Sequence, residues 1–241
     1  MGIPLAFSES EELVGRCWFA SVGLTSDEDG YDDGSVVPHG PWQPLTRDDA
    51  ECLQAGDATP DSVRIELIRR PLPPFATDDE AGRMNAAACL DSLPRGWPTE
   101  LLGCTASPPD AATTTQDSGN GLRIGLHVDN FDRLPYARRH EGRRRLCLNL
   151  GPGPRYLLLA DRDIQQICQD LGVDVQRHYP HTEDIRRYVA EGHPLRCLRI
   201  RLKPGEGYIA PTEFLPHDGS TSATEQTSVA AFWLGRTPHL H

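Results

Sequence analysis

Two histidines and an aspartate near the ends of extended segments are the residues of this chain best suited to metal chemistry. His127 and Asp129 stand near the end of the extended run 121–129, and His217 follows a much later one. In a strand, residues i and i+2 project to one face, so His127 and Asp129 can reach one ion while Val128 points away. With His217 they form the 2-His-1-carboxylate set that holds one face of a non-haem Fe(II) ion and leaves the opposite face open.

A His-X-carboxylate pair is a weak signal by itself, because a chain of this composition contains about one by chance. His181-Thr182-Glu183 has the same spacing, but it opens the segment 182–191, which has the pattern of a capped amphipathic helix. In a helix, residues i and i+2 point about 200° apart and cannot bind one ion. The strand context therefore favours His127 and Asp129 over this second pair.

Length and charge limit the class of protein. The chain has 241 residues, of which 38% are hydrophobic, and a net charge of −11. This length and composition predict one domain with a sizeable core. The acidic balance argues against binding of nucleic acid and favours plain solubility. No coiled-coil pattern points to a particular oligomeric state.

Cysteine usage and the N-terminal segment predict a cytoplasmic protein. Seven cysteines are dispersed without any Cys-X-X-Cys pair, which indicates reduced thiols. The first residues lack a basic segment followed by an apolar one, and no apolar run is long enough to span a membrane.

The first half of the chain mixes elements of both kinds. Its patterns predict short helices at 8–15 and 46–55, the second capped by Thr46, a strand at 62–69 and a longer helix at 78–93. The acidic, glycine-rich stretch 26–34 is predicted to be a solvated loop. The low-complexity stretch 106–120 is predicted to be a surface loop, with a mobile lid as the alternative.

From residue 121 onward, short strands dominate. We predict strands at 121–129, 144–150, 155–160, 195–203, 206–210 and 227–234, and helices at 161–171 and 182–191. The expected fold class is therefore mainly β with flanking helices, as an antiparallel sandwich or jelly roll.

Residues 120–236 resemble the iron(II)- and 2-oxoglutarate-dependent oxygenases of the double-stranded β-helix (cupin-like) fold. The resemblance rests on His127-Val-Asp129, the later His217 and the predicted strand order. It implies a single oxygenase domain over 1–241, in which 1–105 supports a jelly-roll metal-binding core at 120–236. It also implies Fe(II), 2-oxoglutarate and O₂ as reactants. Because halogenating relatives lack the carboxylate, Asp129 implies hydroxylation, desaturation or cyclisation of a small metabolite, such as an amino acid or biosynthetic intermediate.

The chain departs from this family where many members carry an arginine about ten residues after the distal histidine. Residues 225–229 contain no basic side chain. If the leucines of 144–150 face outward, Arg145 and Asn149 face the interior, where Arg145 would bind the far carboxylate of 2-oxoglutarate. Asn149 would then be a hydrogen-bond donor beside the metal, with Thr221, Thr227 and Ser228 as hydroxyl helpers. The alternative places the arginines of 143–145 in a solvated turn.

Other polar residues are candidates for binding substrate, with ordinary turns as the alternative, and Asp218 is a candidate to orient His217. The substrate candidates are Asn130, Asp132, Arg133, Arg155 and Glu213. Two other functions remain open: a cupin-type metalloenzyme that does not use 2-oxoglutarate, and a non-catalytic jelly-roll module that binds a ligand.

Overall fold

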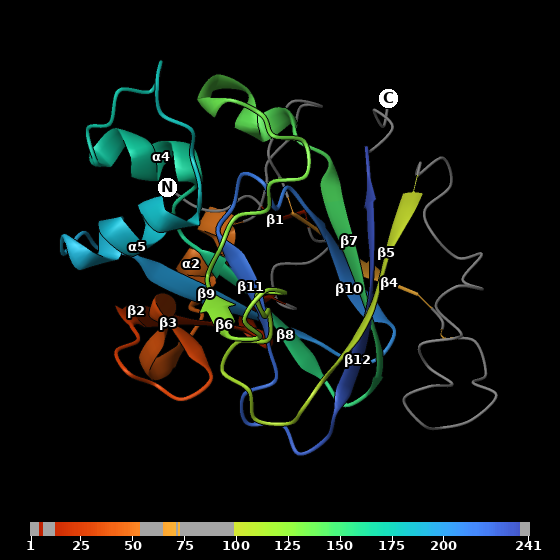
Figure 1. Cartoon of the computed structure of the whole chain (residues 1–241). Coiled ribbons are helices and arrows are strands. Elements are labelled where there is room, and N and C mark those ends of the chain that lie inside the picture. Colours follow the sequence, from red (N-terminus) through yellow and green to blue (C-terminus); the bar gives the residue numbers. More distant parts are fainter. Residues whose placement is uncertain (1–4, 7–12, 54–64, 71, 73–98, 237–241) are drawn as a thin grey trace.

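Two six-stranded sheets form the protein, and the computed structural model describes residues 5–6, 13–53, 65–70, 72 and 99–236 (Figure 1). In spatial order, the first sheet contains β1 (Leu5–Ala6), β4 (Ile65–Arg69), β10 (Glu206–Ala210), β7 (Arg144–Pro152), β12 (Ser228–Gly235) and β5 (Thr99–Ser107). The second contains β11 (His217–Ser220), β8 (Arg155–Ala160), β9 (Arg196–Leu202), β2 (Cys17–Leu24), β3 (Tyr31–Pro44) and β6 (Arg123–Gly125). Neighbouring strands are antiparallel except in the pairs β1–β4 and β3–β6.

Helices lie at the edge of the second sheet. They are α2 (Arg47–Leu53), α4 (Ile164–Asp170), α5 (Thr182–Ala190) and the 3₁₀ helix η1 (Tyr136–Glu141). In Figure 1, α4 and α5 lie together, and α5 contacts β2 and β3. None of the helices in the described ranges combines the length and the apolar character that crossing a membrane requires.

Alternation along the strands divides the apolar side chains between two clusters. Cys147, Tyr208 and Ala230 of the first sheet pack with the leucines of β8 and β9 in the main core between the sheets. The intervening residues of β7, β10 and β12, among them Leu148 and Ile209, form a second cluster on the other face of the first sheet. Residues of β7 with odd numbers therefore face the main core, as predicted.

The prediction of a mainly β protein with flanking helices is confirmed, and the elements after residue 144 agree closely with it. Each of the five strands predicted there corresponds to one of β7, β8, β9, β10 and β12, and the two helices to α4 and α5. Thr46 caps α2 as expected, since its hydroxyl accepts a hydrogen bond from the Asp49 amide at 3.1 Å. The helix at 78–93 and most of the helix at 8–15 lie outside the described residues.

The loop predicted at 26–34 and the strand predicted at 121–129 are each only partly present. The stretch 26–34 is a loop only at its start, because β3 begins at Tyr31, whose ring is buried. Strand β3 contains three prolines and Gly40, residues that indicate turns in a sequence, so its pairing with β2 was not predictable. The strand expected at 121–129 is regular only over Arg123–Gly125, and His127 beyond it makes an isolated bridge.

The six cysteines within the described ranges are free thiols, as the dispersed pattern predicted. Burial raises the pKa of Cys17 to about 12, and burial beside Asp184 raises the pKa of Cys168 to about 12. These thiols stay protonated at neutral pH and are not set up as nucleophiles.

Candidate metal centre

Backbone pairing brings the two predicted histidines together. The His127 amide donates to the His217 carbonyl at 3.1 Å, and the His217 amide donates back at 2.9 Å. A third contact, from the Asp129 amide to the Thr212 carbonyl at 2.9 Å, holds the aspartate beside them. Segments far apart in the sequence thus present three side chains to one point.

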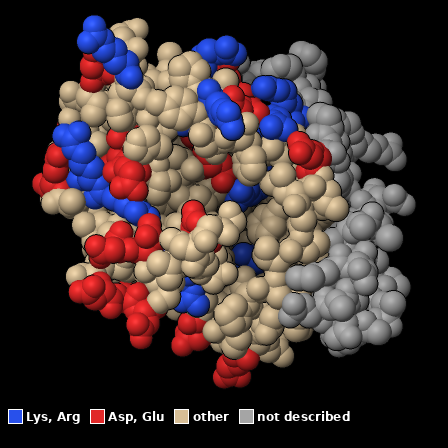
Figure 2. Space-filling model, in the orientation of Figure 1, with Lys and Arg blue, Asp and Glu red and all other residues tan. Residues whose placement is uncertain are grey.

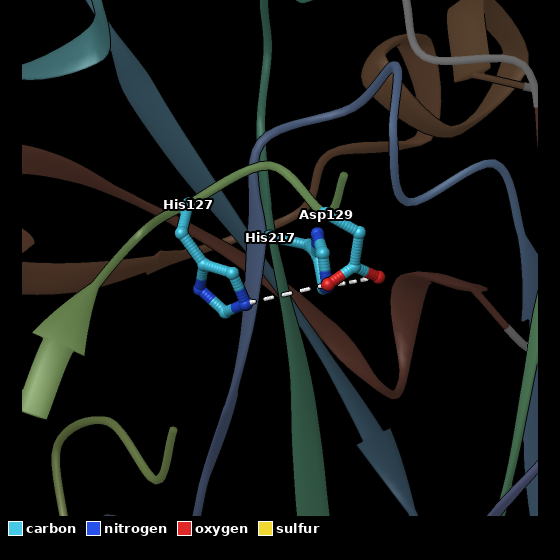
Figure 3. A group of neighbouring side chains, drawn as sticks. All are labelled: His127, Asp129 and His217. Atoms are coloured by element: carbon cyan, nitrogen blue, oxygen red, sulfur yellow. Dashed lines mark ion pairs between the residues drawn. The ribbon is translucent and has the colours of Figure 1, made fainter. Parts of the chain in front are cut away.

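The side chains of His127, Asp129 and His217 converge in the interior (Figure 3). The His217 Nε2 lies 3.7 Å from Asp129 Oδ2, and the His127 Nε2 lies 4.0 Å from Asp129 Oδ1. Two ligands of one ion, each at about 2.0–2.2 Å from it, can be no more than about 4.4 Å apart. Both separations satisfy this limit, one to each oxygen of the Asp129 carboxylate, and all three residues are buried.

Hydrogen bonds to the backbone fix which nitrogen of each histidine faces the centre. The Nδ1 of His127 lies 2.9 Å from the Gly125 carbonyl, and the Nδ1 of His217 lies 3.1 Å from the Leu215 carbonyl. A carbonyl only accepts, so each Nδ1 is the donor and each Nε2 keeps its lone pair toward the centre. Burial also lowers the pKa of His217 to about 3, against the opposing effect of Asp129, and keeps that ring neutral.

The two carboxylate oxygens of Asp129 differ in their contacts. Oδ1 accepts a hydrogen bond from Arg145 Nη2 at 2.8 Å, whereas Oδ2 is buried and has no hydrogen-bond partner. Burial alone raises the pKa of this carboxyl, but Arg145 and the two histidines outweigh burial and bring the pKa below its usual value. A buried, ionised oxygen without a partner is unfavourable unless it binds a cation.

The donor set fits a divalent transition metal. Two neutral imidazole nitrogens and one carboxylate oxygen on one side of an ion match the facial arrangement that non-haem Fe(II) takes. The two inward Nε2 atoms and one carboxylate oxygen of Asp129 are the three atoms that would hold it, and Oδ2 is the oxygen that has no other partner.

The candidate metal centre borders a cavity of about 920 Å³ through His217. His217 and Arg145 lie in its lining, together with Tyr208 and Phe232 of the first sheet. Basic side chains lie in the hollow that Figure 2 shows, whereas acidic ones are spread over the surface around it. The cavity is thus more basic than the acidic chain as a whole.

Arg155 lines this cavity without an anionic partner. It is only 3% exposed, and its Nη1 is buried without a hydrogen-bond partner. No carboxylate of the described segments forms an ion pair with it. Gly219 makes room for this side chain, because a Cβ there would lie 2.5 Å from Arg155 Nη2. Sequence reasoning had assigned Arg155 only to substrate binding.

Arg145 faces the interior as the strand period predicted, but it contacts a metal ligand. Its guanidinium bridges Asp129 and His217, with Nη1 at 3.5 Å from His217 Nε2. The phenyl rings of Phe131 and Phe232 lie 5.5 and 5.6 Å from its Cζ. The alternative of a solvated turn does not describe this residue.

The predicted polar helpers contact backbone away from the cavity lining. Asn149 donates to the carbonyls of Gly153 and Leu202 at 3.0 and 3.1 Å, and its own carbonyl accepts from Ser228. Thr221 donates to the Pro108 carbonyl at 2.7 Å. The Thr227 carbonyl accepts the Gly153 amide at 3.0 Å. These four residues hold turns around the sheets, and none of them lines the cavity.

Four of the five substrate candidates also lie outside the cavity lining. The Asn130 side chain accepts a hydrogen bond from the Tyr179 hydroxyl, and Asp132 pairs with Arg143 Nε at 2.6 Å. Arg133 is exposed with a φ of 51°, a turn conformation. Glu213 is buried and accepts the Asp132 amide at 2.6 Å, with Arg139 at 3.4 Å from its other oxygen. Its carboxylate is therefore occupied within the protein.

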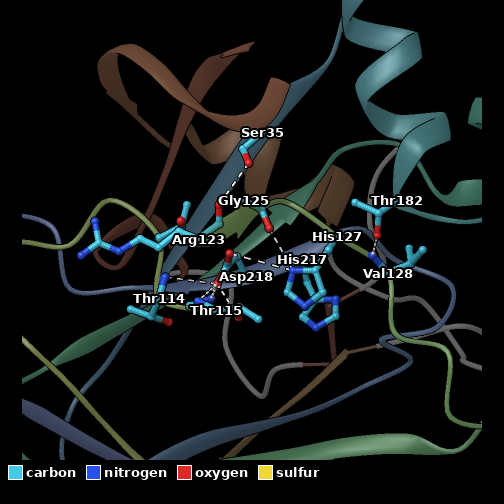
Figure 4. A network of polar contacts seen from close by, with 12 residues as sticks. Ser35, Thr114, Thr115, Arg123, Gly125, His127, Val128, Thr182, His217 and Asp218 are labelled. Atoms are coloured by element: carbon cyan, nitrogen blue, oxygen red, sulfur yellow. Dashed lines mark hydrogen bonds and ion pairs between the residues drawn. The ribbon is translucent and has the colours of Figure 1, made fainter. Parts of the chain in front are cut away.

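Asp218 was predicted to orient His217. In the structure it contacts the cavity wall and lies beside His127 instead (Figure 4). Its Oδ1 accepts the Thr115 hydroxyl at 2.8 Å and the Thr115 amide at 3.1 Å, and its Oδ2 lies 3.9 Å from His127 Nδ1. The His217 ring is instead held by Leu215. Because Asp218 fastens residues 114–115, the stretch 106–120 forms a wall of the cavity rather than a plain surface loop.

Two features of the site were not identified from the sequence. Tyr208 lies in the cavity lining, although its position in the short strand β10 marks it only as a core residue. The wall made by residues 105–108 and 113–118 depends on contacts with Thr221, Asp218 and Tyr31, and no local pattern encodes them.

A second set of metal-binding residue types has a different explanation. Cys168, His178 and Asp184 lie close together beside α5. The Asp184 carboxylate accepts from His178 Nε2 at 2.8 Å and from the His181 amide at 2.9 Å, which closes a capping box at the start of the helix. The helix predicted at 182–191 is thus present, and its carboxylate is used in the cap.

No protein-family model matches the chain, and a search of curated proteins returns no match either.

Proposed function

We propose that this protein is an Fe(II)- and 2-oxoglutarate-dependent oxygenase of double-stranded β-helix architecture that oxidises a small metabolite. The single observation that carries the proposal is the convergence of two inward Nε2 atoms and an unpartnered carboxylate oxygen at the end of a large cavity. When bound, Fe(II) with 2-oxoglutarate and O₂ supplies the oxidation of a substrate C–H bond, with succinate and CO₂ as co-products.

The role of the chain in this reaction is binding and orientation. His127, Asp129 and His217 hold one face of the metal, and the hydrogen bonds at each Nδ1 keep the imidazoles from rotating. The other face is directed toward the cavity, whose volume of about 920 Å³ exceeds what a five-carbon oxo acid needs. The remaining space accommodates the metabolite that is oxidised.

Arg155 is the residue we assign to the far carboxylate of 2-oxoglutarate, in place of Arg145. A guanidinium buried without a counter-ion is unfavourable, and a carboxylate ligand would supply two parallel hydrogen bonds. We also assign Tyr208, which shares the cavity lining, to the same carboxylate as a hydroxyl donor. Arg145 is less suited, because its guanidinium already pairs with Asp129.

The experiment is anaerobic titration of Fe(II) and 2-oxoglutarate into the protein, followed by visible absorption. A chelated oxo acid gives a weak charge-transfer band, which we expect in the wild type and not in His127→Ala or His217→Ala. His181→Ala is the matched control and should keep the band, because the His181 side chain caps α5 and is not one of the three converging residues. Iron binding without the band would contradict a 2-oxoglutarate enzyme and favour another cupin-type metalloenzyme. Failure to bind iron would favour a non-catalytic ligand-binding module.

The same band tests Arg155. Arg155→Gln should weaken 2-oxoglutarate binding by about tenfold to a hundredfold, the usual value of a charged hydrogen bond. Pyruvate, which chelates through the same atoms but lacks the far carboxylate, should bind the variant and the wild type equally. Equal binding of 2-oxoglutarate by the two proteins would contradict this assignment.

A further inference from the structure

Arg145 is in contact with the metal-binding carboxylate through one oxygen only. Its Nη2 donates to Asp129 Oδ1 at 2.8 Å, and the Asp129 Oδ2 is left without a partner. The guanidinium lies near the rings of Phe131 and Phe232, with its Cζ 5.5 and 5.6 Å from their centroids, and its side chain is 15% exposed. Its position is therefore held by contacts with two aromatic rings as well as by charge.

We propose that Arg145 is a positioning residue that keeps Asp129 a one-oxygen ligand and so preserves the open positions on the metal. The inference rests on the proposed function, since the open positions matter because an oxo acid and O₂ must share them. It assigns to Arg145 a task different from binding the oxo acid itself.

Coordination geometry gives the reason. An octahedral ion held by three protein atoms has three free positions, two for a chelating oxo acid and one for O₂. A carboxylate with two free oxygens can bind through both, which would occupy a fourth position. The charge-assisted hydrogen bond from Arg145 occupies Oδ1 and leaves only Oδ2 for the metal.

Arg145 also contributes to the site before metal arrives. Its Nη1 lies 3.5 Å from His217 Nε2 while its Nη2 donates to Asp129, so the guanidinium joins the two side chains. These contacts hold the carboxylate turned toward the histidines. A neutral side chain at 145 would leave Asp129 free to rotate.

The test compares two oxo acids in Arg145→Gln. The variant should bind Fe(II) stoichiometrically. Its charge-transfer band with 2-oxoglutarate and with pyruvate should need an oxo acid concentration about tenfold to a hundredfold higher than in the wild type. This is the usual effect of mutating a residue that hydrogen-bonds a metal ligand. Pyruvate is decisive, because it has no far carboxylate to bind. Arg145→Lys should restore part of the chelation, since an ammonium can still donate to Oδ1.

Arg143→Gln is the matched control. Arg143 pairs with Asp132 at 2.6 Å by the same chemistry, and Asp132 is not a metal ligand. This variant should chelate both oxo acids as the wild type does.

The outcomes separate the two proposals. A wild type without any band contradicts the proposed function. If the wild type shows the band and Arg145→Gln chelates pyruvate normally, only the role of Arg145 is overturned. Loss of metal binding in Arg145→Gln would also overturn that role alone. A second measurement needs no oxo acid: the visible spectrum of Co(II)-loaded protein should change in Arg145→Gln and not in Arg143→Gln, and identical spectra for wild type and Arg145→Gln would refute the inference.

Discussion

Single atoms decide what the buried polar groups of this protein do. Among the described residues, the carboxylates of Asp129 and Asp218 each keep one buried oxygen without a hydrogen-bond partner. That of Asp129 lies 3.7 Å from the free Nε2 of His217, whereas that of Asp218 lies 3.9 Å from His127 Nδ1, which already donates to Gly125. Glu213 and Glu206 have their oxygens occupied by arginines and backbone amides. The difference separates a carboxylate that is available to a ligand from those that hold the fold together.

Glu206 shows the stabilising case and gives a pH-dependent prediction. Burial raises its pKa, but the Lys203 amide, Arg16 and Arg69 outweigh burial, so the pKa falls below the ordinary value of 4.5. A carboxyl with a lowered pKa stabilises the folded state above its unfolded pKa, and this contribution is lost as the pH falls through the folded pKa. Glu206→Gln should therefore cost roughly 1–3 kcal/mol near pH 7 and progressively less in acid.

Urea unfolding of the wild type and Glu206→Gln between pH 7 and pH 3 measures this difference. Glu141→Gln is the control, because Glu141 pairs with Arg138 at an exposed position and should change stability little. A difference between wild type and Glu206→Gln that stays constant with pH would show that the ionised carboxylate is not what stabilises this strand.

At the scale of elements, the short connection between β6 and His127 determines the geometry of the centre. Gly125 has a φ of +67°, and its carbonyl accepts the hydrogen bond from His127 Nδ1. A Cβ at this position would lie 2.4 Å from the Val36 carbonyl oxygen of β3. The glycine thus permits both the left-handed turn and the close approach of the two strands.

Gly125→Ala should therefore destabilise the protein and weaken metal binding together. We expect a loss of roughly 2–4 kcal/mol, against about 1 kcal/mol for Gly172→Ala, which has the backbone strain without the collision. Thermal unfolding and Co(II) titration measure both effects. If the two variants behave alike, Gly125 does not control the position of His127.

Sequence patterns predicted well which side chains of a strand are buried. They predicted poorly which distant residues those side chains contact. The period of two placed Arg145 on the interior face of β7, and it put His127 and Asp129 on one side. It could not say that Arg145 would meet Asp129, because that contact joins β7 to a loop. Asn149 has the same phase as Arg145, yet it bonds to the Leu202 carbonyl of another strand.

Strands of the first hundred residues show a second limit of prediction from sequence. Strand β2 pairs with β9 and with β3 in the second sheet, and β4 pairs with β10 in the first. Strand β3 contains three prolines and two glycines, and an irregular register separates Phe19 from Ser21 of β2. Pairing across long sequence distances therefore stabilises strands that local propensity does not favour.

At the scale of the molecule, the protein encloses a basic cavity within an acidic chain. The net charge is −11, yet Arg123, Arg145 and Arg155 all line the cavity that contains His217. Field lines from arginines are concentrated in such a hollow and attract anionic ligands. This arrangement suits the dicarboxylate cosubstrate that we propose.

The central claim is that one metal ion binds between His127, Asp129 and His217. Anomalous X-ray diffraction at the iron edge, from crystals grown anaerobically with Fe(II), tests it most directly. We expect one strong peak about 2.0–2.3 Å from the Nε2 atoms of both histidines and from Asp129 Oδ2. The absence of a peak there, or a peak beside Cys168, His178 and Asp184 instead, would contradict the account.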